Sequence, residues 1–354
     1  MDSHEILENS ENLKELDRGG MLEAVAGMPD MIPDAVQRAQ SVSLPKMRKV
    51  RQLVVSGMGG SAIAGDVLLD LLSDRAELPL YVNRDYQVPA FVGEGTLFFA
   101  LSYSGDTEET LSALKAAAKR KAKIICLTSG GKLREIAESN KYPLYLIPAG
   151  YQPRAALAYL LVPLLLSLER LGLISGIKEN LEESIALLQR LKNAYGMDAS
   201  LRANPAKQLA KKLCGRLPLV FATGETRAAG LRLKTQFNEN SKVTALFNLF
   251  PELNHNEIVN LSTLKREEHQ FSLILLRDEG DSERNKKRMD ITKSLIGNQL
   301  GGVNEVSSQG KSHLARLLSL IYFGDFVSVY LAVLRGVDPS QVDVISRLKK
   351  ELLR

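Results

Sequence analysis

Short apolar runs alternate with helical stretches along most of the chain. Five runs in the first half lack the polar alternation of a half-exposed strand, so each predicts a strand buried on both faces. These runs are QLVVSG, LPLYVN, TLFFALS, AKIICLTS and YPLYLIP. Helices are expected to begin near Ser61, Thr107 and Lys132, between the strands. This pattern predicts a doubly wound α/β domain with a parallel sheet.

The second half of the chain repeats the plan. LPLVFATGETRAAGLRLKTQFNEN repeats the strand, turn and helix of residues 53–72, and FSLILLRDEGDSERNKKRMDITKSL parallels TLFFALSYSGDTEETLSALKAAAKR. The predicted organisation is a helical N-terminal arm (1–45), a first α/β domain (46–153), linking helices (154–215) and a second α/β domain with a C-terminal helix (216–354).

Two further segments are strongly apolar. The segment 155–168 is shorter than the roughly 20 residues that cross a bilayer, so a buried helix is expected there. The segment 313–334, opened by His313, is predicted to be an amphipathic helix with core or interface positions. Together they carry more apolar surface than two small cores need, which indicates self-association. No membrane partner is expected.

Composition and charge narrow the class of protein. With 354 residues, 45% hydrophobic and 25% charged, the chain is long enough for two domains. The net charge of +5 is interspersed without a basic stripe, so we expect a small anionic ligand and no nucleic acid. Cys126 and Cys214 form no C-x-x-C motif, and the acidic N-terminus has no apolar signal core, so a reducing, cytoplasmic location is expected.

Two loops at the expected carboxyl ends of strands are candidates for binding an anion. The motif SGMGGSA includes Gly60 and Ser61, and the motif LSYSGDTEET carries Ser102, Ser104 and Thr107. Hydroxyls and backbone amides at a helix start suit the three oxygens of a phosphomonoester.

Two other interpretations stay open on the residues alone. The glycine spacing GMGGSA also fits the dinucleotide fingerprint, but the second strand ends in Asn83 rather than in the acid that accepts ribose hydroxyls. Alternatively, Ser102 and Thr107 cap a helix and the glycines allow tight packing.

Five motifs occur in the order found in one enzyme family: GMGGSAIAGD, SYSGDTEET, YQPRAALAYL, FNENSK and PELNHNEI. From about residue 54 to its end, the chain resembles the bifunctional phosphoglucose/phosphomannose isomerases, which carry two sugar isomerase (SIS) domains in tandem. The resemblance implies two doubly wound parallel-sheet SIS domains and a cofactor-free aldose-ketose isomerase. It also implies a phosphosugar substrate and a homodimer with shared active sites.

The resemblance assigns roles to four residues. It implies that Glu239 is the base that shuttles the proton and that His255, from the partner subunit, assists ring opening. Arg154 would stabilise the enediolate, and Lys349 would lie near the ring oxygen, although the adjacent Lys350 leaves the register open. On the residues alone, other interpretations stay open. Glu239 is then a capped carboxylate at a helix end, and His255 is a histidine hydrogen-bonded in a polar loop. Arg154 is then a solvated cap, and Lys349 belongs to a solvated terminal helix.

Two positions depart from the family pattern. Asp106 stands where the family usually has Asn, and Val342 stands where a threonine is tied to accepting both C2 epimers. No H-x-H, H-E-x-x-H or cysteine cluster is present, so no metal is expected. The alternative function is a non-catalytic tandem SIS protein that binds a phosphosugar as a regulator.

Overall fold

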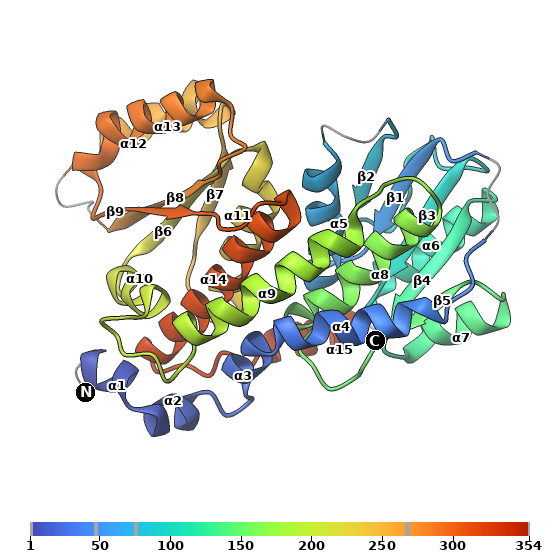
Figure 1. Cartoon of the computed structure of the whole chain (residues 1–354), viewed down its shortest axis with the longest axis horizontal. Coiled ribbons are helices and arrows are strands. Elements are labelled where there is room, and N and C mark those ends of the chain that lie inside the picture. Colours follow the sequence, from blue (N-terminus) through green and yellow to red (C-terminus); the bar gives the residue numbers. More distant parts are fainter. Residues whose placement is uncertain (1–2, 46–48, 74–76, 266–269, 353–354) are drawn as a thin grey trace. The chain divides into compact units, whose positions relative to one another are not determined.

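The structure, a computed structural model, describes residues 3–45, 49–73, 77–265 and 270–352. It divides into two compact units, each built around one parallel sheet (Figure 1). The first-sheet unit consists of Gly27–Ala186 and Ser312–Ala315. The second-sheet unit consists of Met1–Ala26, Leu187–Lys311 and Arg316–Arg354.

The first sheet has five parallel strands in the order β2-β1-β3-β4-β5. They are β1 (Gln52–Ser56), β2 (Leu80–Asn83), β3 (Thr96–Leu101), β4 (Lys123–Thr128) and β5 (Leu144–Leu146). The strand order reverses between β1 and β3, and ligands of open α/β sheets bind outside the carboxyl ends of strands at such a switch point. The two candidate phosphate loops directly follow these two strands.

Helices cover both faces of this sheet, as the apolar runs predicted. Val54 belongs to an apolar cluster with side chains of α6 and α7, whereas Val55 packs beneath Gly65 of α5 on the opposite face. The helices are α4 (Met28–Gln40), α5 (Gly59–Leu72), α6 (Glu108–Lys119), α7 (Gly131–Ser139) and α8 (Leu157–Arg170). The prediction of a buried helix near 155–168 is confirmed by α8, in which most residues are buried.

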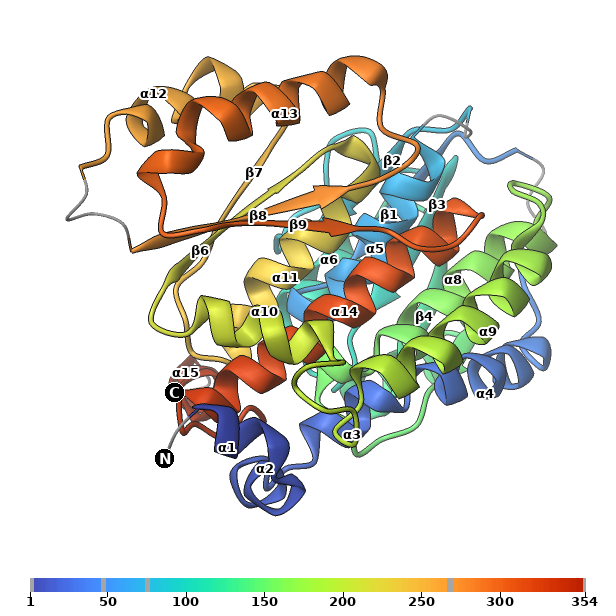
Figure 2. The same cartoon turned by 60° about the vertical axis from the view of Figure 1, so that its left-hand side comes forward.

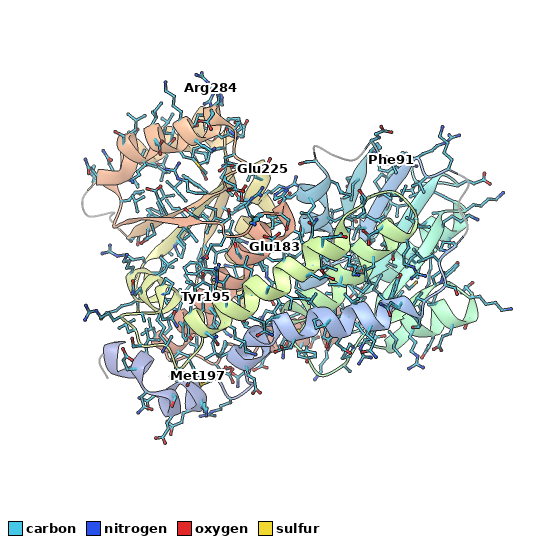
Figure 3. All side chains as sticks on the ribbon, in the orientation of Figure 1. Phe91, Glu183, Tyr195, Met197, Glu225 and Arg284 are labelled. Carbon is cyan, nitrogen blue, oxygen red and sulfur yellow. The ribbon has the colours of Figure 1, made fainter. Side chains whose placement is uncertain are left out.

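The second sheet repeats this design with four parallel strands in the order β7-β6-β8-β9. They are β6 (Leu217–Ala222), β7 (Leu246–Leu249), β8 (Phe271–Arg277) and β9 (Val303–Ser307). Helices α12 (Glu257–Ser262) and α13 (Glu283–Ile296) lie over one face of this sheet and α11 (Arg227–Glu239) lies on the other, as Figure 2 shows. Apolar side chains of α12 and α13 pack against the strands. Figure 3 adds the side chains to the ribbon, with Arg284 of α13 labelled. The predicted tandem of doubly wound α/β domains is therefore confirmed.

The remaining elements connect and flank the two sheets. The helices are α1 (Ser3–Glu8), α2 (Ser10–Leu16), α3 (Met21–Ala26), α9 (Ile177–Tyr195), α10 (Pro205–Leu213), α14 (His313–Leu334) and α15 (Asp343–Leu352). The short 3₁₀ turns are η1 (Pro153–Ala155), η2 (Gly224–Thr226), η3 (Glu252–His255) and η5 (Gly297–Gln299).

Helix α14 differs from its sequence-based prediction. It was expected to be amphipathic, but it is buried on nearly all sides. By length and composition alone, α14 is the one helix in the described ranges that could cross a membrane, and 94% of its most apolar window is buried inside the protein. A core helix has the same composition, so this carries no membrane assignment.

Candidate functional site

The loop after β1 is built for close approach of another backbone. Gly59 has a φ of +48°, which favours glycine, and Gly60 packs against the segment that carries Arg154. A Cβ atom on Gly60 would lie 2.9 Å from both the Cα and the N of Arg154. A side chain at position 60 would therefore push Arg154 away from the loop.

Arg154 lies in η1 and is only 2% exposed. The alternative that it is a solvated helix cap is therefore wrong. A guanidinium that stays charged when buried needs anionic or hydrogen-bonding partners around it. Its segment thus brings a permanent positive charge to the loop after β1.

The loop after β3 is organised from within by Ser102. The Ser102 side chain is fully buried, and its Oγ accepts hydrogen bonds from Gly105 N (3.0 Å) and Thr107 N (3.4 Å). Ser102 Oγ and Thr107 Oγ1 are also hydrogen-bonded at 2.8 Å. Ser61 joins the two loops, because its Oγ accepts a hydrogen bond from Tyr103 N at 3.3 Å. The two glycine and hydroxyl loops are therefore joined by a hydrogen bond.

Ser104 and the start of α6 are the open parts of this loop. Ser104 is exposed, and its Oγ accepts one long hydrogen bond, from Asp106 N at 3.4 Å. Thr107 is the N-cap residue of α6, but its side chain makes no capping hydrogen bond. The first amides of α6 are therefore available to an anion, which a helix start favours.

Asp106, the departure from the family pattern in this loop, has a structural partner. Its Oδ1 accepts a hydrogen bond from Lys132 N at 3.1 Å, at the start of α7. Gly105 is equally constrained, since its φ is +79° and a Cβ there would lie 1.8 Å from Gly130 O. An asparagine at position 106 has the same Oδ1 acceptor, so the substitution retains this contact.

The end of β2 does not fit a dinucleotide. Asn83 is buried, and its Nδ2 donates to Ser56 Oγ (3.3 Å) and to Asp85 O (3.0 Å). This amide is engaged in fixing the strand ends, where a dinucleotide site has a carboxylate that faces the ribose. The geometry of the first sheet therefore favours a phosphomonoester.

Glu239 is the last residue of α11 and is partly buried. The turn that follows it is anchored to α14: Asn240 Nδ2 donates to Ser328 Oγ (2.9 Å), and Ser241 Oγ donates to Ser328 O (2.6 Å). The helix end that carries this carboxylate is therefore held firmly.

The structure does not bring His255 together with Glu239. Helix α11 starts at the carboxyl end of β6 and runs back for about 20 Å, so Glu239 lies at the amino edge of the sheet. Strand β7 is parallel to β6 and leads to His255 at the carboxyl edge. His255 is exposed and makes no hydrogen bond or ion pair within the described part of the chain.

Lys349 and Lys350 both lie in α15 and are both exposed. Val342 immediately precedes this helix. Four apolar residues of α15 are exposed as well: Val344, Ile345, Leu348 and Leu352. The described contacts of α15 favour neither lysine over the other.

The second sheet carries a counterpart of the phosphate loop, and its chemistry is opposite. Asp278, after β8, accepts from Arg316 Nε at 3.0 Å and from Ser308 Oγ at 2.7 Å. Asp281 accepts from Thr223 Oγ1, and burial raises the pKa of the Asp281 carboxyl. These two carboxyl groups stand where the loop of the first sheet offers hydroxyls. The loop after β8 is therefore less suited to a phosphate than the loop after β3.

One residue with a clear structural role carried no sequence signal. Lys242, three residues after Glu239, adopts a φ of +54°, and its ammonium contacts four carbonyl oxygens. The conformation of a lysine in a turn depends on tertiary contacts, so the motif FNENSK does not reveal it. Among the residues that the structure describes, no group of three or more His, Cys, Asp or Glu side chains is placed to hold a metal ion.

Comparison with known families matches most of the chain. Residues 46–171 match the SIS domain, and residues 202–352 match the family described as the bacterial phospho-glucose isomerase C-terminal SIS domain. A bifunctional phosphoglucose/phosphomannose isomerase of Caldicellulosiruptor bescii is 44% identical over 334 residues, which cover 94% of this chain and 98% of that relative.

Two more distant proteins show how far the fold extends. A D-glucosamine-6-phosphate 4-epimerase of Sulfolobus acidocaldarius is 30% identical over 90% of this chain and 93% of its own. A crystal structure of a glucose-6-phosphate isomerase like protein from Thermus thermophilus superposes with a TM-score of 0.66 at 21% identity, and covers 97% of this chain and 98% of that one. At this identity the likeness shows a shared fold alone.

Proposed function

Because this chain belongs to the bifunctional phosphoglucose/phosphomannose isomerase family, we propose that it interconverts fructose 6-phosphate with glucose 6-phosphate and with mannose 6-phosphate. The protein is a phosphosugar isomerase, and its family relatives do not favour the regulator alternative. The single observation that best supports the site is the packing of Gly60 on Arg154. This packing brings the segment of the buried Arg154 into contact with the glycine loop after β1, which is one of the two candidate phosphate loops.

The proposed phosphate site consists of Ser104, Thr107 and the first amides of α6, supported by Gly60, Ser61 and Ser102. Ser102 and Ser61 hold the loops in shape because their Oγ atoms accept hydrogen bonds from Gly105 N and Tyr103 N, respectively. Ser104 is the most open hydroxyl of the set. The anion would therefore be held by few side-chain contacts and by several backbone amides.

Isomerisation moves one proton between C2 and C1 and another between the two oxygens. In the proposed mechanism, the Glu239 carboxylate takes the proton from C2 of the aldose and returns it to C1, through an enediol. Arg154 stabilises the negative charge that develops on the oxygens. His255 exchanges the proton needed to open the ring, and Lys349 lies near the ring oxygen.

We further propose a homodimer in which His255 completes the site of the partner subunit. Within one chain, His255 and Glu239 lie at opposite edges of the second sheet, and His255 is exposed. The layer formed by helices α12 and α13 also has exposed apolar side chains. Their exposed fractions are 65% for Val259, 47% for Ile291 and 55% for Leu295. An isologous interface at this layer would cover these side chains.

The function is tested by incubating the purified protein with fructose 6-phosphate and measuring the aldose products with coupled dehydrogenases. Glucose 6-phosphate and mannose 6-phosphate should both form, with equal rates in the presence and absence of a chelator. Formation of mannose 6-phosphate is the stricter test, because Val342 stands where the family has the threonine tied to accepting both C2 epimers. Binding of fructose 6-phosphate without turnover would instead support the regulator alternative.

Ser104→Ala should weaken substrate binding by about 1 to 3 kcal/mol, because a hydrogen bond to the charged phosphate is lost. The thermal midpoint should stay the same, since Ser104 Oγ accepts only one long bond within the loop. Steady-state kinetics would show this as a raised KM. Ser139→Ala, at an exposed position of α7, is the matched control, and an unchanged KM in Ser104→Ala would remove Ser104 from the site.

The shared site predicts complementation between two inactive variants. When Glu239→Gln and His255→Ala homodimers exchange subunits, roughly half of the dimers are mixed, and each mixed dimer has one intact site of two. Activity should therefore return to roughly a quarter of the wild-type value. Absence of recovery after subunit exchange has been demonstrated by mass spectrometry would rule out the shared site.

A further inference from the structure

Lys242 connects two segments of the second-sheet unit through its ammonium group. Its Nζ donates to the carbonyl oxygens of Glu239 (3.0 Å) and Asn240 (3.2 Å) at the end of α11. It also donates to Asp338 O (2.6 Å) and Pro339 O (3.3 Å), in the connection between α14 and α15. One ammonium thus bridges the segment that ends in Glu239 and the segment that leads into α15.

The position of the Lys242 ammonium at the end of α11 is electrostatically favourable. The last carbonyls of a helix have no partner within the helix and carry the negative end of its dipole, so a cation stabilises them. Glu239 and Asn240 supply two of these carbonyls at the end of α11. The ammonium therefore replaces the hydrogen bonds that further turns of the helix would have made.

The backbone conformation of Lys242 by itself carries no argument. Lys121 and Lys141 have φ values of +63° and +54°, close to that of Lys242. Lys242 and these two lysines are all exposed, but the side chains of Lys121 and Lys141 make no hydrogen bond within the described ranges. What distinguishes Lys242 is the set of carbonyls around its ammonium. The two other lysines therefore offer matched controls for the strain of a left-handed lysine.

We propose that Lys242 is a positioning residue for the reaction, and this rests on the proposed role of Glu239 as the base. By bonding the carbonyl of Glu239 itself, the ammonium fixes the last turn of α11 against Asp338 and Pro339. It thereby sets the carboxylate in register with the segment that leads to α15, which carries Lys349. Lys242 does not contact the substrate.

Loss of this bridge should affect proton transfer more than binding. The ties from Asn240 and Ser241 to Ser328 remain, so the turn stays folded on α14 but gains freedom at its end. A displacement of about 1 Å at a reacting group can cost about 100-fold in rate. The proposed phosphate loops belong to the first-sheet unit and do not depend on Lys242. The expected signature is a reduced kcat with a nearly unchanged KM.

The test is Lys242→Gly, which permits the positive φ while it removes the ammonium. We expect kcat to fall at least about 10-fold, with KM within about twofold of the wild type. Lys141→Gly relieves the same backbone strain at a position without a bridge and should keep the wild-type kcat. Thermal unfolding of both variants shows whether a fall in kcat merely follows lost stability.

Chemical rescue separates the ammonium from the fold. Lys242→Cys, made in a Cys214→Ser background, is alkylated with 2-bromoethylamine to restore an ammonium on a side chain of lysine length. The buried Cys126 is shielded from the reagent. The aminoethylated enzyme should regain at least half of the wild-type kcat, whereas alkylation with iodoacetamide, which is neutral, should leave kcat low.

The outcomes distinguish this inference from the proposed function. The positioning role of Lys242 is overturned if Lys242→Gly keeps the wild-type kcat, or if the two alkylated enzymes have the same kcat. The proposed function stands in either case, provided that Glu239→Gln is inactive. Near-normal turnover of Glu239→Gln would instead overturn the base on which the inference rests. A low kcat in Lys242→Gly together with selective rescue by the ammonium supports both.

Discussion

Glu239→Gln should turn over fructose 6-phosphate at least about 100-fold more slowly than the wild type, because the amide keeps the shape of the side chain and cannot accept the proton. KM should change little, since the proposed phosphate contacts are intact. Steady-state kinetics of both directions measures the effect. In the wild type, solvent deuterium should also enter the sugar at C1 or C2, because a proton held by one carboxylate can exchange.

The control for this variant is a carboxylate of the same type outside the site. Glu182→Gln removes an exposed carboxylate of α9 that lies 4.0 Å from Lys178, and should leave kcat unchanged. If Glu239→Gln turned over near the wild-type rate, Glu239 would not be the base, whatever the isotope result.

Asp325→Ala should lower the free energy of unfolding of the second-sheet unit by about 3 to 5 kcal/mol, because it removes the carboxylate that forms an ion pair with the buried Arg232. The two side chains are each 2% exposed, and Arg232 bonds both carboxylate oxygens, at 2.9 and 2.7 Å. Gln236 Nε2 also donates to Asp325, at 2.8 Å. Denaturant unfolding followed by circular dichroism measures the loss.

Two further variants test whether this loss of stability comes from the unpaired buried charge. Replacing both partners, Arg232→Met with Asp325→Leu, should recover much of the stability, because no unpaired charge is left buried. Glu138→Ala breaks the exposed pair with Arg134 and should cost less than about 1 kcal/mol. A small loss in Asp325→Ala would show that solvent or a neighbouring group compensates Arg232.

Much of the fold could be predicted from the sequence because its signals are local. Strands such as β3 and β4 are apolar on both faces, and only a parallel sheet with helices on both sides buries such runs. The repeated order of strand, turn and helix likewise predicted two similar α/β units. Chain connectivity then places the loops after β1 and β3 together at the switch point.

The candidate site was predictable in residue type but not in residue role. The row of hydroxyls at Ser102, Ser104 and Thr107 indicated a phosphate loop, yet the three look alike in sequence. Burial separates them, because Ser102 is turned inward to the amides of its own loop and Ser104 is exposed. Which side of a loop faces solvent depends on what packs beneath it, and no local pattern records that.

Helix α14 shows the same limit for the core. The sequence predicts an amphipathic helix here, with core or interface positions. Polar residues such as Asp325 and Ser328 interrupt its apolar ones. In the structure these polar side chains are buried as well, paired with Arg232 and Asn240 of the α11 segment. A polar side chain can be buried when another part of the chain supplies its hydrogen-bond partner. For Asp325 this partner is Arg232, about 90 residues away in the sequence.

Periodicity and motifs lie in neighbouring residues, so they predict the two parallel-sheet units, the glycine and hydroxyl loops and the family. Only the folded chain shows that Arg154 is buried against Gly60 and that Glu239 and His255 lie at opposite sheet edges. The bridge from Lys242 between α11 and the α14–α15 connection is likewise visible only there. These contacts join residues that are distant in the chain. Their energy depends on burial and on partners that only the folded chain brings together.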